Sequence, residues 1–97
     1  MRYSLHPEAE ADLDAIIDRY LTNFGRKAVE RFLTEYDRVV GIVIENLGMG
    51  TKTSRGRRMY PFEGVPYLIV YRADEDGVRI LVVRHQHRKP SIGGRRS

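Results

Sequence analysis

Residues 66–90 read PYLIVYRADEDGVRILVVRHQHRKP, and this stretch decides the fold. Two runs within it, residues 67–71 and 80–83, consist of the β-branched, aromatic and aliphatic residues that strands favour. Residues 73–77 between them end in Asp-Gly, a pair that suits a tight turn because glycine adopts a positive φ at little steric cost. Both runs are apolar at consecutive positions, so we expect a central β-hairpin with both faces covered.

Basic and imidazole side chains follow the second run directly. They are Arg84, His85, His87, Arg88 and Lys89. A His-x-His pair without further Cys, His or carboxylate ligands nearby does not predict a metal site, so we expect neither a metal nor another cofactor. His85 borders the apolar run and is interpreted as a partly buried structural side chain. His87 lies beyond that run and is the better candidate for function.

The composition is that of one small globular domain. The 97 residues contain no cysteine, and no apolar run approaches the roughly 20 residues of a membrane helix. We expect a cytoplasmic protein with a single domain over residues 1–90 and a flexible basic tail over residues 91–97.

The charge is distributed unevenly along the chain. Residues 1–48 contain nine acidic and six basic side chains, a balance of −3. Residues 49–97 contain four acidic and eleven basic side chains, a balance of +7. The basic half predicts an anionic partner, either a phosphate backbone or an acidic protein segment, and the alternative is a solvated surface that keeps the domain soluble.

The remaining chain predicts two helices, with one further strand before them and one after them in the sequence. Residues 2–5 alternate like a half-buried strand, and residues 57–62 form another strand before the central hairpin. Helices are predicted over residues 7–23 and 27–47, with residues 49–56 as a loop. The apolar stripe of the first helix is Ala9, Leu13, Ile16, Ile17, Tyr20 and Phe24.

This order predicts an α+β fold. An N-terminal strand and an α-helical hairpin precede a three-stranded antiparallel meander, and the helices pack on one face of the twisted sheet. The second helix is broadly apolar over residues 39–47. That width fits either the deepest part of the core or a groove for a partner helix.

The order and spacing of these features resemble the RelE/ParE superfamily of bacterial type II toxin–antitoxin toxins, often labelled plasmid stabilisation proteins. The resemblance covers about residues 2–90 and combines many weak matches. The matching residues are Tyr3, Pro7, Glu8, Ala9, Asp12, Leu13, Ile16, Tyr20, Gly25, Ala28, Phe32, the block 66–71 and the block 82–90.

The resemblance implies a growth-arresting toxin in a heteromeric complex with a cognate antitoxin. The acidic, amphipathic C-terminal segment of such an antitoxin usually lays a helix on an apolar groove of the toxin. Candidate antitoxin-binding residues in this chain are Ile17, Leu21, Val39, Val43 and Leu47.

Two activities are implied by the superfamily, and the ParE-like one is favoured. ParE-like members inhibit DNA gyrase, for which the candidate target-binding residues are Arg84, His87, Arg88 and Lys89. Leu68 stands where RelE-like enzymes often place an arginine, no tyrosine follows His87, and the helical hairpin is long.

The alternative is a RelE-like, ribosome-dependent mRNA endoribonuclease that acts without metal. RNA cleavage needs a proton acceptor, a proton donor and cations that stabilise the charge of the phosphorane. The candidates for these roles are Lys52, Arg57, Arg58, His87 and Arg88. Whether the protein is an enzyme therefore depends on which of the two activities it has.

Overall fold

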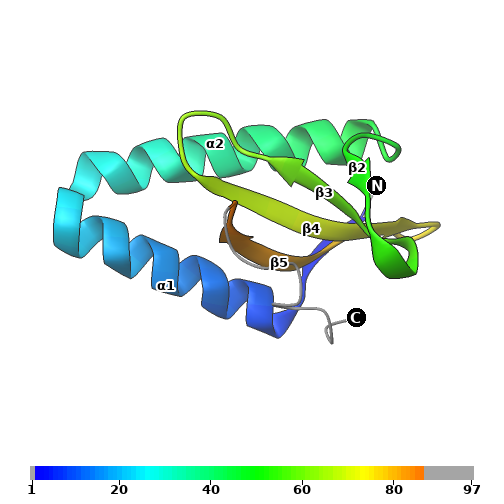
Figure 1. The fold of residues 1–97 in the computed structure, drawn as a ribbon, viewed down its shortest axis with the longest axis horizontal. Helices are drawn as coiled ribbons and strands as arrows, with labels where there is room; N and C mark the ends of the chain where they lie inside the picture. The colour runs from blue at the N-terminus through cyan, green and yellow to red at the C-terminus, as the bar shows by residue number, and fades with distance from the viewer. Residues whose placement is uncertain (1, 87–97) are drawn as a thin grey trace.

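Two helices lie against one face of a five-stranded mixed sheet (Figure 1). The structure is a computed structural model that describes residues 2–86. Its elements are β1 (Arg2–Leu5), α1 (Pro7–Phe24), α2 (Arg26–Glu45), β2 (Thr51–Lys52), a short 3₁₀ turn η1 (Ser54–Gly56), β3 (Arg58–Pro61), β4 (Tyr67–Asp74) and β5 (Gly77–His85). The α+β prediction is confirmed, including the N-terminal strand, the helical hairpin and the antiparallel meander.

The sheet order is β1-β5-β4-β3-β2, with β1 parallel to β5 and the other pairs antiparallel. The predicted hairpin is β4-β5, and Asp74 pairs with Gly77 at its tip. The strand β2 differs from the prediction, because the loop expected over residues 49–56 includes two residues that pair with β3. A two-residue strand in a polar segment has no periodicity that a sequence reading can detect.

Local capping fixes the start of the helical hairpin and its reversal. The ring of His6 accepts a hydrogen bond from the backbone N–H of Glu8 at 3.1 Å, and Pro7 occupies the first turn. A single residue, Gly25, joins the helices with φ of 87°, and its N–H donates to the carbonyl of Tyr20 at 3.0 Å. Only glycine adopts this backbone conformation without strain, which explains the sharp reversal.

The main core lies between the helices and the sheet. Phe32 of α2 is fully buried, and its ring centre lies 5.7 Å from that of Phe62 and 5.8 Å from that of Tyr67. Both contacts have the edge-to-face geometry that aromatic pairs prefer. The other buried side chains of this cluster include Ile16, Tyr36, Val39, Val43, Ile69, Tyr71, Ile80 and Val83.

The width of the α2 stripe reflects the core and not a groove. Val39 and Val43 have no exposed surface and pack in the main core. Their role in antitoxin binding stays a prediction, and in this conformation the sheet already covers both side chains. An apolar run that reaches the centre of a small core needs no partner to bury it.

The face of the sheet opposite the helices carries a second, smaller cluster. It consists of Leu68, Val70, Leu81 and Val82, with Met59 packed against them. Because Val70 pairs with Val82 and Tyr71 with Ile80, Leu81 is the extra residue of a β-bulge. All five residues over 67–71 are buried, which confirms that both faces of the central strand are covered.

Two glycines are expected to respond oppositely to alanine. Gly50 has φ of 89°, and a Cβ there would lie 2.5 Å from the carbonyl oxygen of Met59. Gly50→Ala should lower the free energy of unfolding by roughly 1–3 kcal/mol, measured by urea denaturation. Gly41 lies inside α2, and a Cβ added there would have nothing within 4 Å. Gly41→Ala should therefore raise the free energy of unfolding by about 0.4–1 kcal/mol. Equal effects of the two changes would contradict this description of the β2 turn.

Candidate functional site

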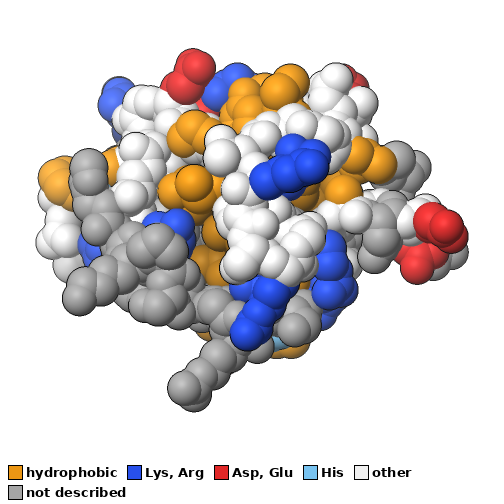
Figure 2. All heavy atoms as spheres, turned by 45° about the vertical axis from the view of Figure 1, so that its right-hand side comes forward, with side chains coloured by type: hydrophobic (Ala, Val, Ile, Leu, Met, Phe, Trp, Pro, Cys, Tyr) orange, Lys and Arg blue, Asp and Glu red, His pale blue; other side chains and the backbone are white. Residues whose placement is uncertain are grey.

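Six cationic side chains come from the segments at one end of the sheet. They are Lys52, Arg55, Arg57, Arg58, Arg72 and Arg79. Here β2, η1 and the start of β3 lie near the tip of the β4-β5 hairpin, and Figure 2 turns this end toward the viewer. Lys and Arg side chains occupy the middle and lower part of that view, and acidic side chains lie toward its rim. We call this region the basic end.

The register assigns these cations to different faces of the sheet. Arg58 pairs with Tyr71, which belongs to the core under the helices, and its Nη1 donates to the carbonyl of Gly50 at 3.3 Å. Arg72 is one residue further along β4 and therefore projects to the opposite face. Arg79 pairs with Arg72 and shares that face.

Arg57 is a buried cation beside other cations. Its side chain is 7% exposed, and burial lowers the pKa of its guanidinium. The positive charges of Arg55 and Arg72 lower that pKa further. Arg55 itself adopts φ of 62° and is followed by Gly56 at 72°, a left-handed pair that forms the η1 turn. Sequence reasoning identified Arg57 as a candidate, but not its proximity to Arg72.

The hydroxyl of Tyr71 lies close enough to the helix-side cation Arg58 for that charge to act on its pKa. Burial raises its pKa, and the hydroxyl donates a hydrogen bond to the backbone carbonyl of Met49. A phenol with a raised pKa and a fixed acceptor is a poor proton acceptor at neutral pH. We therefore assign Tyr71 to holding the segment before β2 against the sheet.

Arg84 and His85, at the end of β5, lie far from the basic end. β5 runs from Gly77 to His85, a length of about 26 Å at the usual rise per residue. Lys52, Arg57 and Arg58 are thus brought together at one end, and Arg84 and His85 lie at the other. The predicted positions His87, Arg88 and Lys89 lie outside the described residues.

Arg84, which was predicted to bind the target, is a buried side chain. Only 8% of its surface is exposed, because it lies beside Leu68 on the face opposite the helices, and burial lowers its pKa. One guanidinium nitrogen, Nη1, donates to the carbonyl of His85 at 3.4 Å. A buried arginine that contributes to packing presents little charge to a macromolecular target.

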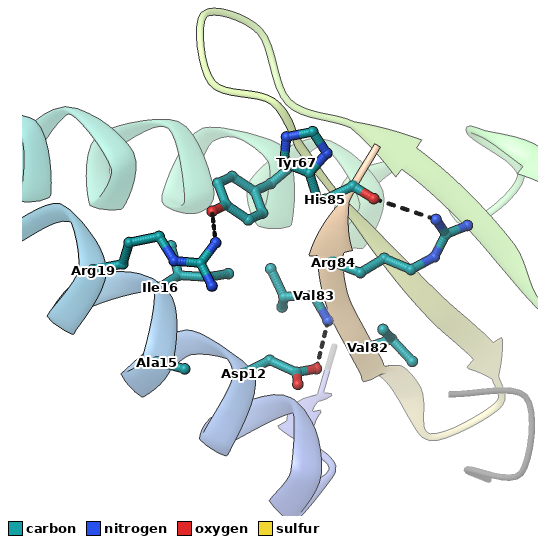
Figure 3. A pocket seen from close by; sticks show the side chains of 9 residues that line it. All are labelled: Asp12, Ala15, Ile16, Arg19, Tyr67, Val82, Val83, Arg84 and His85. Atoms are coloured by element: carbon teal, nitrogen blue, oxygen red, sulfur yellow. Dashed lines mark hydrogen bonds between the residues drawn. The ribbon is translucent and has the colours of Figure 1, made fainter. Parts of the chain in front are cut away.

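A small pocket of about 100 Å³ separates α1 from the end of β5 (Figure 3). Asp12 accepts a hydrogen bond from the backbone N–H of Val83 at 3.0 Å, and Arg19 donates to the hydroxyl of Tyr67 at 3.4 Å. The ring of His85 packs edge-on against Tyr67 at 5.5 Å. The pocket is well below the roughly 300 Å³ of a small-molecule site, so these contacts fasten α1 to the sheet. His85 is only partly exposed, as predicted.

Apolar side chains are exposed near the tip of the helical hairpin. Leu21 is 53% exposed and Phe24 is 71% exposed. Phe24 also lines a shallow groove, and the other residues that line it are Tyr20, Ala28, Arg31, Gly64 and Val65. We call Leu21, Phe24 and this groove the hairpin-tip patch. The sequence prediction included Leu21, but it assigned Phe24 to the buried stripe.

Phe24 follows the helical periodicity of α1, but it is exposed because the helical hairpin extends one turn beyond the end of the core. The aromatic ring of Phe24 lies 6.0 Å from that of Tyr20. The ring of Tyr20 also packs against the core rings of Phe32 and Tyr67. The core therefore ends at Tyr20. Ile17 and Leu47 are half-buried, and Leu47 lies beyond the opposite end of α2, about 30 Å from the tip.

The described part of the chain offers no metal-binding cluster and no membrane span. Within residues 2–86, no group of three or more His, Cys, Asp or Glu side chains is arranged to hold a metal ion. In the same range, neither helix combines the length and apolar character needed to span a bilayer.

Comparisons with known proteins agree with the fold. A family model described as "ParE toxin of type II toxin-antitoxin system, parDE" matches residues 3–90. A solved structure titled "Chromosomal ParDE TA system from P. aeruginosa" superposes with a TM-score of 0.76 at 25% sequence identity. The match covers 88% of this chain and 95% of that one. No curated protein matched in sequence.

Proposed function

This chain belongs to the ParE toxin family of type II toxin–antitoxin systems, and from that membership we propose that it inhibits DNA gyrase and is neutralised by a cognate antitoxin. The observation that carries the proposal is the family match over residues 3–90. Gyrase acts on chromosomal DNA, so we place the toxin in the cytoplasm.

The arrangement of charged groups supports inhibition over RNA cleavage. The basic end contains arginines and Lys52, and the histidines in the described residues, His6 and His85, lie elsewhere. His6 caps α1 and His85 packs on Tyr67. Within residues 2–86 no histidine joins the cations of the basic end, and cations alone can bind an anionic surface by charge.

The antitoxin is proposed to bind the hairpin-tip patch. A helix with apolar side chains on one face would cover Leu21 and Phe24, which are the two most exposed large apolar side chains among the described residues. Arg31 lines the adjoining groove and would meet an acidic side chain on the same antitoxin segment. Ile17 extends this surface along α1. Leu47 would be reached only by an antitoxin segment that continues along α2.

Pulse labelling in a bacterial host tests the proposed activity. Induction of the toxin should reduce thymidine incorporation several-fold before methionine incorporation changes, because a gyrase block stops replication first. Co-expression of the antitoxin encoded beside the toxin should restore growth. An early fall in methionine incorporation, together with codon-spaced breaks in mRNA, would instead favour the RelE-like activity.

A further inference from the structure

The loop between β3 and β4, residues 62–66, forms one wall of the groove in the hairpin-tip patch. Gly64 and Val65 of this loop line the groove together with Tyr20 and Phe24 of α1 and two residues of α2. Figure 1 shows the loop beside α2. Residues 62–66 belong to no helix or strand, so the shape of the groove depends on the contacts that hold the loop in place.

The carboxylate of Glu35 fastens this loop to α2. Its Oε2 accepts a hydrogen bond from the backbone N–H of Glu63 at 2.6 Å. Arg38 fixes the carboxylate, because its Nε donates to Oε1 at 2.7 Å and its Nη2 donates to Oε2 at 2.6 Å. These hydrogen bonds from Arg38 lower the pKa of Glu35, so the acceptor is charged at neutral pH. A hydrogen bond to a charged acceptor is stronger than one between neutral groups.

Gln86 fastens the same loop from the end of β5. Its backbone N–H donates to the carbonyl of Pro66 at 2.9 Å. Its side-chain Nε2 donates to the carbonyl of Phe62 at 3.3 Å and to that of Tyr67 at 3.0 Å. The loop is therefore held from two sides, by β5 and by Glu35 on α2.

We propose that Glu35 and Gln86 are positioning residues for antitoxin binding, because they hold residues 62–66 where the loop completes the groove. This inference rests on the proposed antitoxin site at the hairpin-tip patch. The antitoxin is the occupant because the chain belongs to a toxin–antitoxin family, and Phe24 and Arg31 suit a segment with apolar and acidic side chains. Neither Glu35 nor Gln86 lines the groove, so both act through the loop.

A loop that is already in place lowers the cost of binding. The apparent affinity of a partner falls in proportion to the fraction of free molecules that have the binding conformation. A loop released by mutation must return before the antitoxin can bind, so the loss appears in the association rate constant. Once the antitoxin is bound, its contacts hold the loop, and the dissociation rate constant stays nearly the same.

Calorimetry and stopped-flow binding, with full-length toxin and the antitoxin encoded beside it, test the proposal. Glu35→Ala should weaken binding at least about fivefold, as expected if the loop is in place for less than about a fifth of the time. The association rate constant should fall by the same factor. Glu35→Gln keeps an oxygen acceptor for the N–H of Glu63 and should recover most of the affinity. Gln86→Ala keeps only the backbone bond to Pro66 and should weaken binding in the same way as Glu35→Ala.

Glu45→Ala is the matched control. Glu45 is an exposed acid at the end of α2, and its removal changes the net charge by the same amount as Glu35→Ala. Removing a negative charge from the toxin should by itself favour an acidic partner, so weaker binding of Glu35→Ala reports the loop and not the charge. Urea denaturation checks that each variant is folded under the binding conditions. If Glu35→Ala does not fold, Gln86→Ala carries the test.

Hydrogen exchange of the free toxin tests the loop without the antitoxin. In Glu35→Ala, the amides of Phe62 and Gln86 should exchange at least about tenfold faster, because a hydrogen bond to a charged group no longer opposes opening of the loop. The amide of Val83, which donates to Asp12 away from the loop, should keep its exchange rate. Unchanged exchange at Phe62 and Gln86 would show that Glu35 does not hold the loop, and would overturn its positioning role.

The binding results separate this inference from the antitoxin site itself. If Phe24→Asp weakens binding but Glu35→Ala and Gln86→Ala bind as the wild type does, the positioning role is overturned and the hairpin-tip site stands. Equal weakening by Glu45→Ala would also overturn the positioning role. If Phe24→Asp binds the antitoxin as tightly as the wild type, the hairpin-tip site fails and this inference fails with it.

Discussion

Replacing Phe32 with alanine is expected to lower the free energy of unfolding by about 3–5 kcal/mol. The side chain has no exposed surface and contacts Tyr20, Phe62 and Tyr67 through its ring. These residues come from α1, the β3-β4 loop and β4, so the truncation leaves a cavity where three segments meet. Domains of this size are stable by only about 5–15 kcal/mol, so the variant should be partly unfolded at 37 °C.

Urea denaturation followed by circular dichroism measures this effect, and Leu33→Ala is the matched control. Leu33 is the next residue of α2 and is 38% exposed, so its truncation should cost less than about 1 kcal/mol. The thermal midpoint should fall by more than about 12 °C for Phe32→Ala. Similar costs for the two variants would show that Phe32 is not the centre of the core.

Replacing Phe24 with aspartate is expected to weaken antitoxin binding at least 30-fold, or by about 2 kcal/mol. Phe24 is 71% exposed and is the largest apolar group of the hairpin-tip patch. A carboxylate there would be desolvated beneath the antitoxin helix without a partner. Because the side chain contributes little to the free toxin, unfolding should change by less than about 0.5 kcal/mol.

Titration calorimetry with the antitoxin encoded beside the toxin measures this affinity. Asn23→Asp is the control, because it adds the same charge at an exposed neighbour on α1 that lies outside the proposed patch. It should change the affinity less than threefold. If Phe24→Asp binds the antitoxin as tightly as the wild type, the hairpin-tip patch is not the antitoxin site.

Local patterns are sufficient to predict most of the fold. The helical stripes, the turn at residues 73–77 and the run over residues 67–71 each depend on neighbouring residues, and all correspond to observed elements. The pairing of β1 with β5 joins residues more than 70 positions apart, and no local pattern specifies its partner or direction. The short β2 strand depends on pairing with β3 in the same way.

The candidate site is harder to predict because it depends on faces and distances. The apolar run over residues 80–83 contains the bulge residue Leu81, so alternation cannot show which way Arg84 points. Pairing across β4 and β5 also brings Arg72 and Arg79 together, and no sequence motif marks either residue. Phe24 shows the converse limit, since helical spacing identifies a stripe but not where the core beneath it ends.

DNA supercoiling by purified gyrase is the most direct measurement of the proposed activity. Micromolar toxin should abolish supercoiling of a relaxed plasmid, and the antitoxin should restore it. The Phe24→Asp toxin should inhibit gyrase as strongly as the wild type does, but the antitoxin should not relieve inhibition by this variant. Full supercoiling in the presence of a micromolar excess of folded toxin would contradict the proposal that this chain inhibits gyrase.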